Sequence, residues 1–143
     1  MSRSAEGAVF VFSGPIEDRL GVRERFDSYS DAVTRQAMDD YLDCWTDDGA
    51  RFGAGGECQG IEALRQHWHG IWKMLSQMGF MTQIGSIVVD GETATARSYC
   101  LETLRFHDDT THQLIGTYDD ELRRVDGVWR FSTRRYRVLI DNI

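Results

Sequence analysis

Residues 87–94 read Ile-Val-Val-Asp-Gly-Glu-Thr-Ala, a β-branched run that stops at an Asp-Gly pair and then resumes. An Asp-Gly pair between apolar runs is a strong signal for a tight β-hairpin turn. The signal recurs at residues 126–127, and residues 108–111 (Asp-Asp-Thr-Thr) form a further polar turn. Three turns that join four apolar runs predict an antiparallel meander, with strands over 84–89, 93–107, 111–125 and 128–140.

Upstream of this meander, apolar residues recur at helical spacing. The spacing predicts one helix over 17–36, a short second helix that includes Trp45, and a third helix over 61–77. Helices followed by long strands are typical of an α+β domain. We therefore predict a curved antiparallel sheet covered by N-terminal helices, in one domain over 17–143.

An arm over residues 1–16 precedes this domain. Its phenylalanines, Phe10 and Phe12, alternate with valines. The arm could add an edge strand to the sheet or cross to a partner subunit, and disorder is an equal alternative for a chain terminus.

Composition narrows the function classes. The 143 residues suit one domain, and the formal net charge of −7 disfavours nucleic acid as a partner, because nucleic-acid binding needs a basic face. The apolar run over 8–12 is too short for a signal peptide or a membrane span, so we expect a cytoplasmic protein without a membrane partner. The three cysteines are scattered, and His67 and His69 diverge on a helix, so we expect no metal.

The turns also predict the register of the strands. A turn centred between residues 109 and 110 pairs Tyr99 with Asp120 and Leu101 with Tyr118. A turn centred on residues 126–127 pairs Asp120 with Thr133 and Tyr118 with Arg135, and it also pairs residue 122 with residue 131.

One sheet face should then carry most of the large apolar side chains and meet the helices: Tyr99, Leu101, Leu114, Tyr118, Leu122, Trp129 and Phe131. Asp120, Thr133 and Arg135 are the polar side chains on that face, and a buried carboxylate is costly unless it is paired or functional. Ala94 and Ala96 fit this face only if a β-bulge lies near residues 97–98.

With this layout the sequence resembles the nuclear-transport-factor-2-like superfamily, in its SnoaL-like branch, which includes relatives of scytalone dehydratase and bile-acid dehydratase. The resemblance spans roughly residues 17–138 and rests on Tyr29 and on the segments 45–52, 60–64, 90–94, 116–118 and 126–131. It implies a cone-shaped fold around a deep pocket, a homodimer, and cofactor-free lyase, isomerase or cyclase chemistry. Two features of the dehydratase-like members are absent, because Thr34 stands at their acidic position and residues 80–82 (Phe-Met-Thr) stand at their histidine.

These considerations select four candidate catalytic residues. Asp120 would act as a general base, Tyr29 would hydrogen-bond a carbonyl or a leaving hydroxyl, Arg135 would hold an oxyanion, and His67 would be a reserve base. The structural alternatives are a hydrogen bond or ion pair of Asp120 with Arg135 or Arg97, a core tyrosine at position 29 and a core-edge histidine at position 67. Six further residues are predicted to bind the ligand: Tyr99, Tyr118, Thr34, Trp45, Trp68 and Thr133.

The sequence thus predicts a cofactor-independent lyase, isomerase or polyketide cyclase that acts by proton transfer on a small, mostly apolar cyclic or polyketide-like compound. The alternative is a non-catalytic small-molecule-binding or assembly protein of the same fold, and a third possibility is the small subunit of an oxygenase. A homodimer should form through the outer face of the sheet, where an apolar cluster is expected: Leu104, Phe106, Ile115, Tyr136 and Val138.

Overall fold

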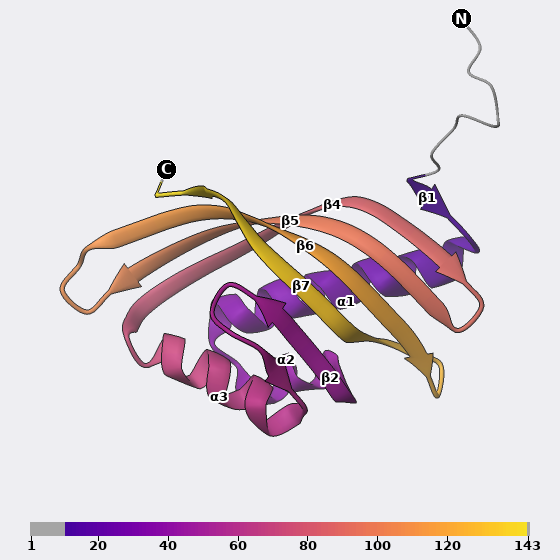
Figure 1. Cartoon of the computed structure of the whole chain (residues 1–143), viewed down its shortest axis with the longest axis horizontal. Helices are drawn as coiled ribbons and strands as arrows, with labels where there is room; N and C mark the ends of the chain where they lie inside the picture. The colour runs from indigo at the N-terminus through magenta and orange to yellow at the C-terminus, as the bar shows by residue number, and fades with distance from the viewer. Residues whose placement is uncertain (1–10, 143) are drawn as a thin grey trace, which may run out of the picture.

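The computed structural model describes residues 11–142 and shows an α+β fold in which the helices lie beneath a curved sheet (Figure 1). The elements are β1 (Phe12–Ser13), α1 (Ile16–Arg35), α2 (Met38–Asp43), β2 (Trp45–Gly53), β3 (Cys58–Gln59), α3 (Ile61–Trp72), β4 (Leu75–Asp90), β5 (Thr93–Phe106), β6 (Thr111–Val125) and β7 (Val128–Asp141). The predicted α+β class is confirmed.

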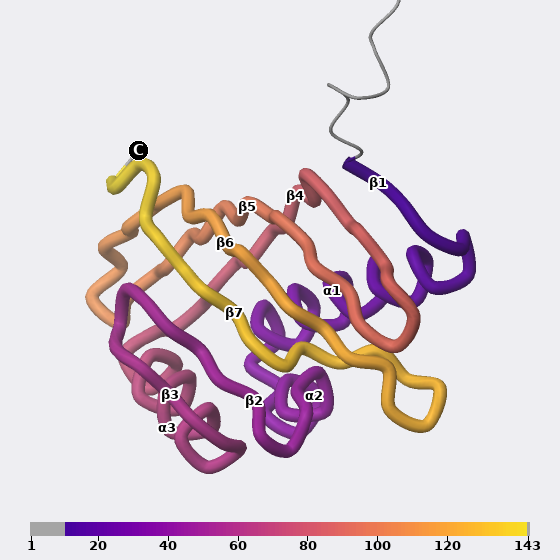
Figure 2. The backbone as a smooth tube through the Cα atoms, turned by 45° about the vertical axis from the view of Figure 1, so that its right-hand side comes forward, coloured from indigo at the N-terminus to yellow at the C-terminus, as the bar shows by residue number. Residues whose placement is uncertain are grey.

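The seven strands form one sheet in the order β1-β4-β5-β6-β7-β2-β3. Strands β4 to β7 are the predicted antiparallel meander. The sheet as a whole is mixed rather than antiparallel, because β1 pairs in parallel with β4 and β2 pairs in parallel with β7 (Figure 2). Both added strands are N-terminal segments that join the sheet at its edges.

Part of the predicted arm is therefore an edge strand, in which Phe12 and Ser13 lie opposite Ile87 and Val88. Residues 1–10, including Phe10, lie outside the described residues. Among residues 11–142, no helix has the length and hydropathy that crossing a membrane requires.

Two predicted helix ends were wrong for the same reason. Trp45 begins β2 instead of ending the second helix, because its backbone pairs with Phe131 of β7. The third helix ends at Trp72, and β4 begins at Leu75 rather than at Ile84. In both places, pairing with a distant strand overrides the local helical spacing.

The predicted register between β5 and β6 was wrong. Asp120 lies opposite Ala96, and Tyr99 lies opposite Thr117. The last pair before the turn is Arg105–Thr111, so the loop holds an odd number of residues, and its centre falls on residue 108. Because side chains alternate between faces, this odd shift reverses the face of every β5 residue.

The inner row of β5 is therefore small and polar, and all its members are buried: Ala94, Ala96, Ser98, Cys100 and Glu102. Tyr99 and Leu101 point to the outer face. The bulge expected near residues 97–98 lies instead in β4, between Ile84 and Ser86, so β5 alternates without a break.

Between β6 and β7 the predicted pair Leu122–Phe131 is confirmed. An irregularity next to it shifts the following pairs by one residue, so that Asp120 lies opposite Arg134 and not opposite Thr133. Tyr118 consequently lies opposite Tyr136 and not opposite Arg135. The shift brings Arg134 and Tyr136 to the inner face and leaves Arg135 exposed.

Aromatic rings fill the space between the helices and the sheet. Tyr29 of α1 lies at their centre, and its ring centroid is 5.4 Å from that of Tyr41, 5.5 Å from Phe131 and 5.6 Å from Phe80. The contacts with Tyr41 and Phe131 are edge-to-face, a geometry that is favourable for aromatic pairs. Helix α1 is thereby fixed against the concave face of the sheet (Figure 1).

A glycine lets β2 approach β7 closely. Gly53 has φ +112°, and a Cβ atom there would lie 1.9 Å from the carbonyl oxygen of Tyr136. Gly56 in the same loop also has a positive φ, +98°, but a Cβ atom there would meet nothing within 4 Å. An alanine at Gly53 would therefore introduce both backbone strain and a steric clash, whereas an alanine at Gly56 would introduce backbone strain alone.

We predict that Gly53→Ala lowers the free energy of unfolding by at least about 2 kcal/mol more than Gly56→Ala, because only the first substitution adds an overpacked contact. Chemical denaturation of both variants measures the difference. Equal losses in the two variants would contradict the close approach of Gly53 to Tyr136.

Candidate functional site

A buried ion pair joins β6 to β7 on the inner face of the sheet. Arg134 donates from Nε to Oδ1 of Asp120 at 2.7 Å and from Nη2 to Oδ2 at 3.3 Å. Ser98 of β5 donates to Oδ2 of Asp120 at 3.0 Å. Asp120 is 2% exposed and Arg134 is 1% exposed, so both charges are removed from water. Sequence analysis predicted this alternative for Asp120 but assigned the wrong arginine.

Aromatic rings surround the Arg134 guanidinium. Its Cζ lies 3.7 Å from the ring centroid of Tyr118, 4.3 Å from that of Phe131 and 4.4 Å from that of Tyr29. Ring faces attract cations, and they do so more strongly where water is excluded. Nη1 of Arg134 and the hydroxyl of Tyr29 are buried without a hydrogen-bond partner among the described residues. Two donors are thus left unused in the interior.

The protonation of this pair follows from its burial. Burial raises the pKa of Asp120 above its ordinary value, and the charge and hydrogen bonds of Arg134 oppose that rise. Both carboxylate oxygens are already engaged, so Asp120 has little capacity left to accept a substrate proton. Burial also raises the pKa of Tyr29, whose hydroxyl therefore stays protonated at neutral pH.

A second polar cluster surrounds Glu102, farther along β5. Tyr136 of β7 donates its hydroxyl to Oε2 of Glu102 at 2.7 Å, and the thiol of Cys100 lies 3.9 Å from the same oxygen. Burial raises the pKa of Glu102, while the Tyr136 hydrogen bond and the charge of Arg51 partly oppose it. A buried carboxyl with a raised pKa is suited to acid–base catalysis.

The guanidinium of Arg51, on β2, lies over the ring of Tyr136. Its Cζ is 5.1 Å from the ring centroid of Tyr136, and its Nη1 donates to the carbonyl oxygen of Ala54 at 2.7 Å. Arg51 is only 3% exposed, and its Nε has no hydrogen-bond partner among the described residues.

His67 of α3 completes this second group. Burial and, to a lesser extent, the charge of Arg51 lower the pKa of His67 to about 4, so its imidazole is neutral at pH 7. Its Nε2 is buried without a partner in the described structure. A Cβ atom on Gly55 would lie 3.1 Å from the His67 ring and 3.5 Å from Nη1 of Arg51, so one loop covers both side chains.

We name the residues Arg51, His67, Glu102 and Tyr136 the Glu102 cluster. Sequence analysis identified only His67 among them. The signal for Glu102 was the period of two from Ala94 and Ala96, which already marked an inward-facing row. Following that row through the strand, instead of introducing a bulge, would have placed Glu102 inside.

The predicted site residues lie in three places: in the core beneath the sheet, on its outer face, and at the edge of β4. Tyr29, Trp45, Trp68 and Tyr118 are buried in the core as predicted. Tyr99, Thr133 and Arg135 do not join them. Tyr99 lies on the outer face because of the register of β5, and the exposed Arg135 stacks over Phe52 at 4.6 Å from its ring centroid. Thr133 is partly buried and, with Arg135, lines an outer cavity of about 650 Å³.

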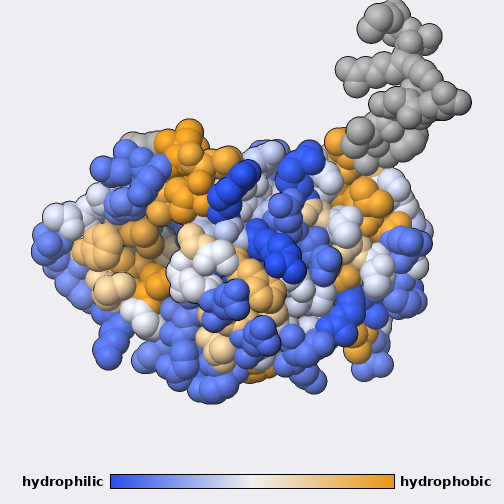
Figure 3. All heavy atoms as spheres, in the orientation of Figure 1, coloured by the Kyte–Doolittle hydropathy of each residue, from blue (hydrophilic) through white to orange (hydrophobic). Residues whose placement is uncertain are grey.

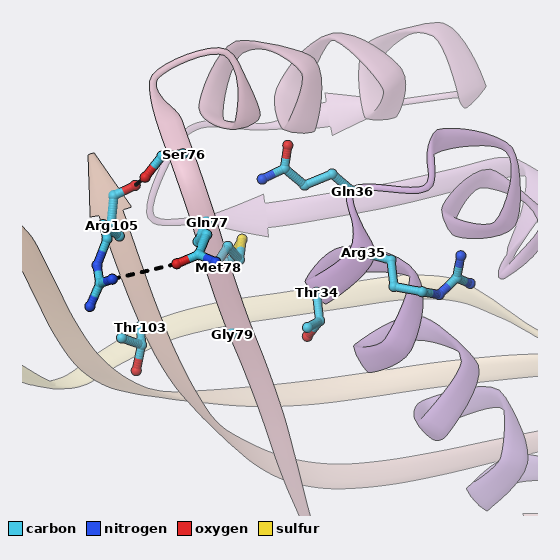
Figure 4. A pocket seen from close by; sticks show the side chains of 9 residues that line it. All are labelled: Thr34, Arg35, Gln36, Ser76, Gln77, Met78, Gly79, Thr103 and Arg105. Atoms are coloured by element: carbon cyan, nitrogen blue, oxygen red, sulfur yellow. Dashed lines mark hydrogen bonds between the residues drawn. The ribbon is translucent and has the colours of Figure 1, made fainter. Parts of the chain in front are cut away.

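Thr34 lies at the edge of β4, away from the buried aromatic residues. Its hydroxyl accepts a hydrogen bond from the backbone N–H of Phe80 at 3.0 Å and lies 3.3 Å from the carbonyl oxygen of Phe80, which satisfies part of the free edge of β4. Thr34 also lines a cavity of about 540 Å³ at the rim, between the end of α1 and strands β4 and β5 (Figure 4). There Arg105 donates to Gln77 at 3.5 Å, while Arg35 points away from these strands.

Neither of these two cavities is lined by the Glu102 cluster. A third cavity, of about 270 Å³, is lined by three of the predicted site residues, Asp120, Thr133 and Arg135. The unpartnered donors and acceptors are instead in the interior, on Tyr29, Arg51, His67 and Arg134. Within residues 11–142, no group of three or more His, Cys, Asp or Glu side chains is placed to hold a metal ion. The interior polar groups are the candidate site, because they include buried donors and acceptors without a partner among the described residues.

We predict that Asp120→Asn lowers the free energy of unfolding by roughly 3 kcal/mol, because it leaves Arg134 buried without a counter-charge. Asp119→Asn, on the exposed neighbouring residue, is the matched control and should change stability little. Denaturation of both variants is the measurement. An Asp120→Asn variant as stable as the control would show that the ion pair does not hold the sheet together.

Comparisons with known proteins agree with this architecture. A search of curated proteins found no match. Among solved structures, a single-residue variant of Rv3472 from Mycobacterium tuberculosis, described as of unknown function, is 28% identical, with a TM-score of 0.79 over 87% of this chain and 78% of that one. A provisionally named scytalone dehydratase from Novosphingobium aromaticivorans is 20% identical, with a TM-score of 0.82 over 89% and 87%.

A hexachlorocyclohexane dehydrochlorinase, LinA-type3 from Novosphingobium barchaimii, is 17% identical, with a TM-score of 0.78 over 89% of this chain and 90% of that one. At these identities the last two structures share the fold with this chain. The SnoaL-like domain family matches residues 15–135, which include all three helices and most of the meander. The chain therefore belongs to the SnoaL-like domain family.

Proposed function

We propose that this protein is a cofactor-independent lyase or isomerase that moves a proton on a small, mostly apolar cyclic or polyketide-like compound. The observation that carries the proposal is the buried Glu102 carboxyl, which shares the interior with donors and acceptors that have no partner among the described residues. Membership of the SnoaL-like family supports the proposal, as does the likeness to structures named as a dehydratase and a dehydrochlorinase.

Glu102 is the base in this proposal. Tyr136 holds Oε2 of the carboxylate by a hydrogen bond of 2.7 Å, while no hydrogen bond from the described residues engages Oε1. Burial raises the pKa of Glu102, which strengthens it as a proton acceptor once it is ionised. Glu102 would remove a proton from a carbon next to a carbonyl group and return it elsewhere on the substrate or to a leaving group.

The charge that develops on the substrate oxygen needs donors. Tyr29 offers a buried O–H without a partner in the described structure, and a preorganised donor of this kind stabilises an enolate most effectively where water is excluded. His67 is neutral and can accept or donate a proton at Nε2. These roles replace the one predicted for Arg135, which lies on the outer face.

Asp120 has a positioning role in this proposal. It binds Arg134 through both oxygens, and the resulting ion pair fixes the guanidinium beneath Tyr29 and Tyr118. Asp120 thus differs from Glu102, which keeps one oxygen without a hydrogen bond from the described residues. The assignment of the base moves accordingly from β6 to β5.

The second candidate function is binding without catalysis. It is favoured by one observation: the positions where dehydratase-like members carry their acidic residue and histidine hold Thr34 and residues 80–82 (Phe-Met-Thr) here. Thr34 bonds the backbone of Phe80, whose ring is buried in the aromatic core. Neither side chain can transfer a proton to a substrate. Substitution of Glu102 distinguishes the two functions, because catalysis requires its carboxyl group and binding alone does not.

We predict that the protein accelerates exchange of the α-hydrogens of 2-tetralone, a bicyclic ketone, with deuterium from D₂O, as followed by proton NMR. Glu102→Gln should reduce this exchange by about a hundredfold or more, the usual contribution of a general base. Glu121→Gln, on the exposed face of β6, is the matched control and should exchange at the rate of the unmodified protein.

Exchange by the unmodified protein at the buffer rate, or exchange that Glu102→Gln leaves intact, would contradict the catalytic proposal. The melting temperature of each variant, measured on the same preparation, separates loss of the base from loss of the fold. Continued binding of the ketone by Glu102→Gln would show that the site itself is intact.

We further propose that two copies of the chain pair through the outer face of the sheet. The predicted apolar cluster needs correction, because Tyr136 is buried and Leu104 and Phe106 pack against the core. An apolar row that crosses the four long strands takes its place: Met81, Leu101, Ile115 and Ile140. Figure 3 shows a hydrophobic patch beside the C-terminal end of β7, where Leu139 and Ile140 are exposed.

Light scattering should accordingly give twice the chain mass of 16.4 kDa at micromolar concentration. Leu101→Glu should reduce the mass to that of one chain, because it places a charge in the centre of the row. Met74→Glu, at an exposed methionine between α3 and β4, is the control and should stay dimeric. A monomeric unmodified protein would overturn this proposal.

A further inference from the structure

Arg51 is a buried cation without a carboxylate partner among the described residues. Ten ion pairs within 4.0 Å join the described residues, and Arg51 takes part in none of them. Arg134, the other guanidinium on the inner side of the sheet, is paired with Asp120. A buried charge is costly unless a partner compensates it, so the protein maintains Arg51 at a site that lacks its counter-ion.

The two guanidinium groups differ in the edge that they leave free. Arg134 binds Asp120 through Nε and Nη2, the edge that matches the two oxygens of a carboxylate. Arg51 uses Nη1 for the carbonyl oxygen of Ala54, which orients the guanidinium and leaves the Nε–Nη2 edge without a partner among the described residues. Arg51 therefore leaves free the same edge that Arg134 uses to bind Asp120.

The groups around this edge suit an anion with an aromatic body. The Tyr136 ring lies against the guanidinium and stacks on Tyr118 at a centroid distance of 4.8 Å. His67, whose ring lies beside the loop, is neutral at pH 7 and does not compete for the anion. Glu102 is bonded through Oε2 to Tyr136 and not to Arg51.

The edge lies close to the surface. Residues 53–57, which follow Arg51 in the chain, form an exposed loop, and Gly55 is the residue that approaches both His67 and Arg51. Three of its glycines have positive φ values, a backbone that side chains rarely adopt. An exposed loop thus lies directly beside Arg51 and His67.

We propose that Arg51 binds the carboxylate of the ligand through its Nε–Nη2 edge, so that the substrate is a small aromatic or alicyclic carboxylic acid. This inference rests on the proposed function and names its substrate class. The bound carboxylate neutralises Arg51 and removes an influence that lowers the pKa of Glu102, which makes Glu102 a stronger base when substrate is present.

A matched pair of probes tests the proposal. 2-Naphthoate and 2-naphthamide have the same ring body and differ in charge, and their binding can be followed by calorimetry on the full chain. The unmodified protein should bind the carboxylate at least about tenfold more tightly than the amide, as expected for charge-assisted hydrogen bonds in a buried site. Arg51→Gln should abolish this preference while leaving affinity for the amide unchanged.

Two further variants make the result specific. Arg51→Lys keeps the charge but loses the paired edge, so it should retain only part of the preference. Arg135→Gln removes an exposed guanidinium from the adjacent strand, opposite Phe52, and should retain all of it. Thermal unfolding of each variant confirms that the fold is kept.

Equal binding of the two probes, no saturable binding of naphthoate at millimolar concentration, or a preference that survives in Arg51→Gln would overturn the proposal. None of these outcomes depends on turnover. A failure of the carboxylate site is therefore distinct from a failure of Glu102 as the base, which the exchange of 2-tetralone measures.

Discussion

The buried pair between Asp120 and Arg134 is the interaction on which the rest of the structure depends. It crosses from β6 to β7 at the point where the register changes, and Ser98 extends it to β5. Removing two charges from water is unfavourable unless their geometry is good and the remaining polar atoms are satisfied. Here the carboxylate and the guanidinium meet edge to edge inside a shell of aromatic rings, so the geometry is good and most of their polar atoms are satisfied. The pair thereby specifies one register for the sheet.

A stack of four groups links this pair to the Glu102 cluster. Arg134 lies against Tyr118, Tyr118 stacks on Tyr136, and Tyr136 lies against Arg51. The stack has a guanidinium with a carboxylate partner at one end and, among the described residues, a guanidinium without one at the other. The paired end holds the sheet together, and the unpaired end is available to a ligand. Structure and proposed function are thus assigned to two arginines that share the same aromatic support.

Much of the fold could be predicted from local signals. The site depended on which face of the sheet each strand residue occupies, and a register shift of an odd number of residues reverses that face. The Asp-Gly turns located the meander, and apolar spacing located α1 and α3. The β5–β6 loop is centred on residue 108 rather than between residues 109 and 110, and this difference was enough to reverse the faces of β5. One irregularity beside Leu122 then placed Arg134, instead of Arg135, on the inner face. Such shifts arise from backbone geometry in the loop and in the sheet, which residue types specify only weakly. The buried row that ends at Glu102 was visible as an alternation, but only if no bulge interrupted it.

The central claim is that the interior holds a carboxyl group poised for proton transfer beside an anion-binding arginine. NMR titration of the Glu102 side-chain carboxyl carbon, assigned by its loss in Glu102→Gln, tests this claim most directly. The account predicts a midpoint above the ordinary glutamate pKa of 4.5, and a further rise when 2-naphthoate is bound. A midpoint at or below 4.5 that naphthoate does not move would contradict it.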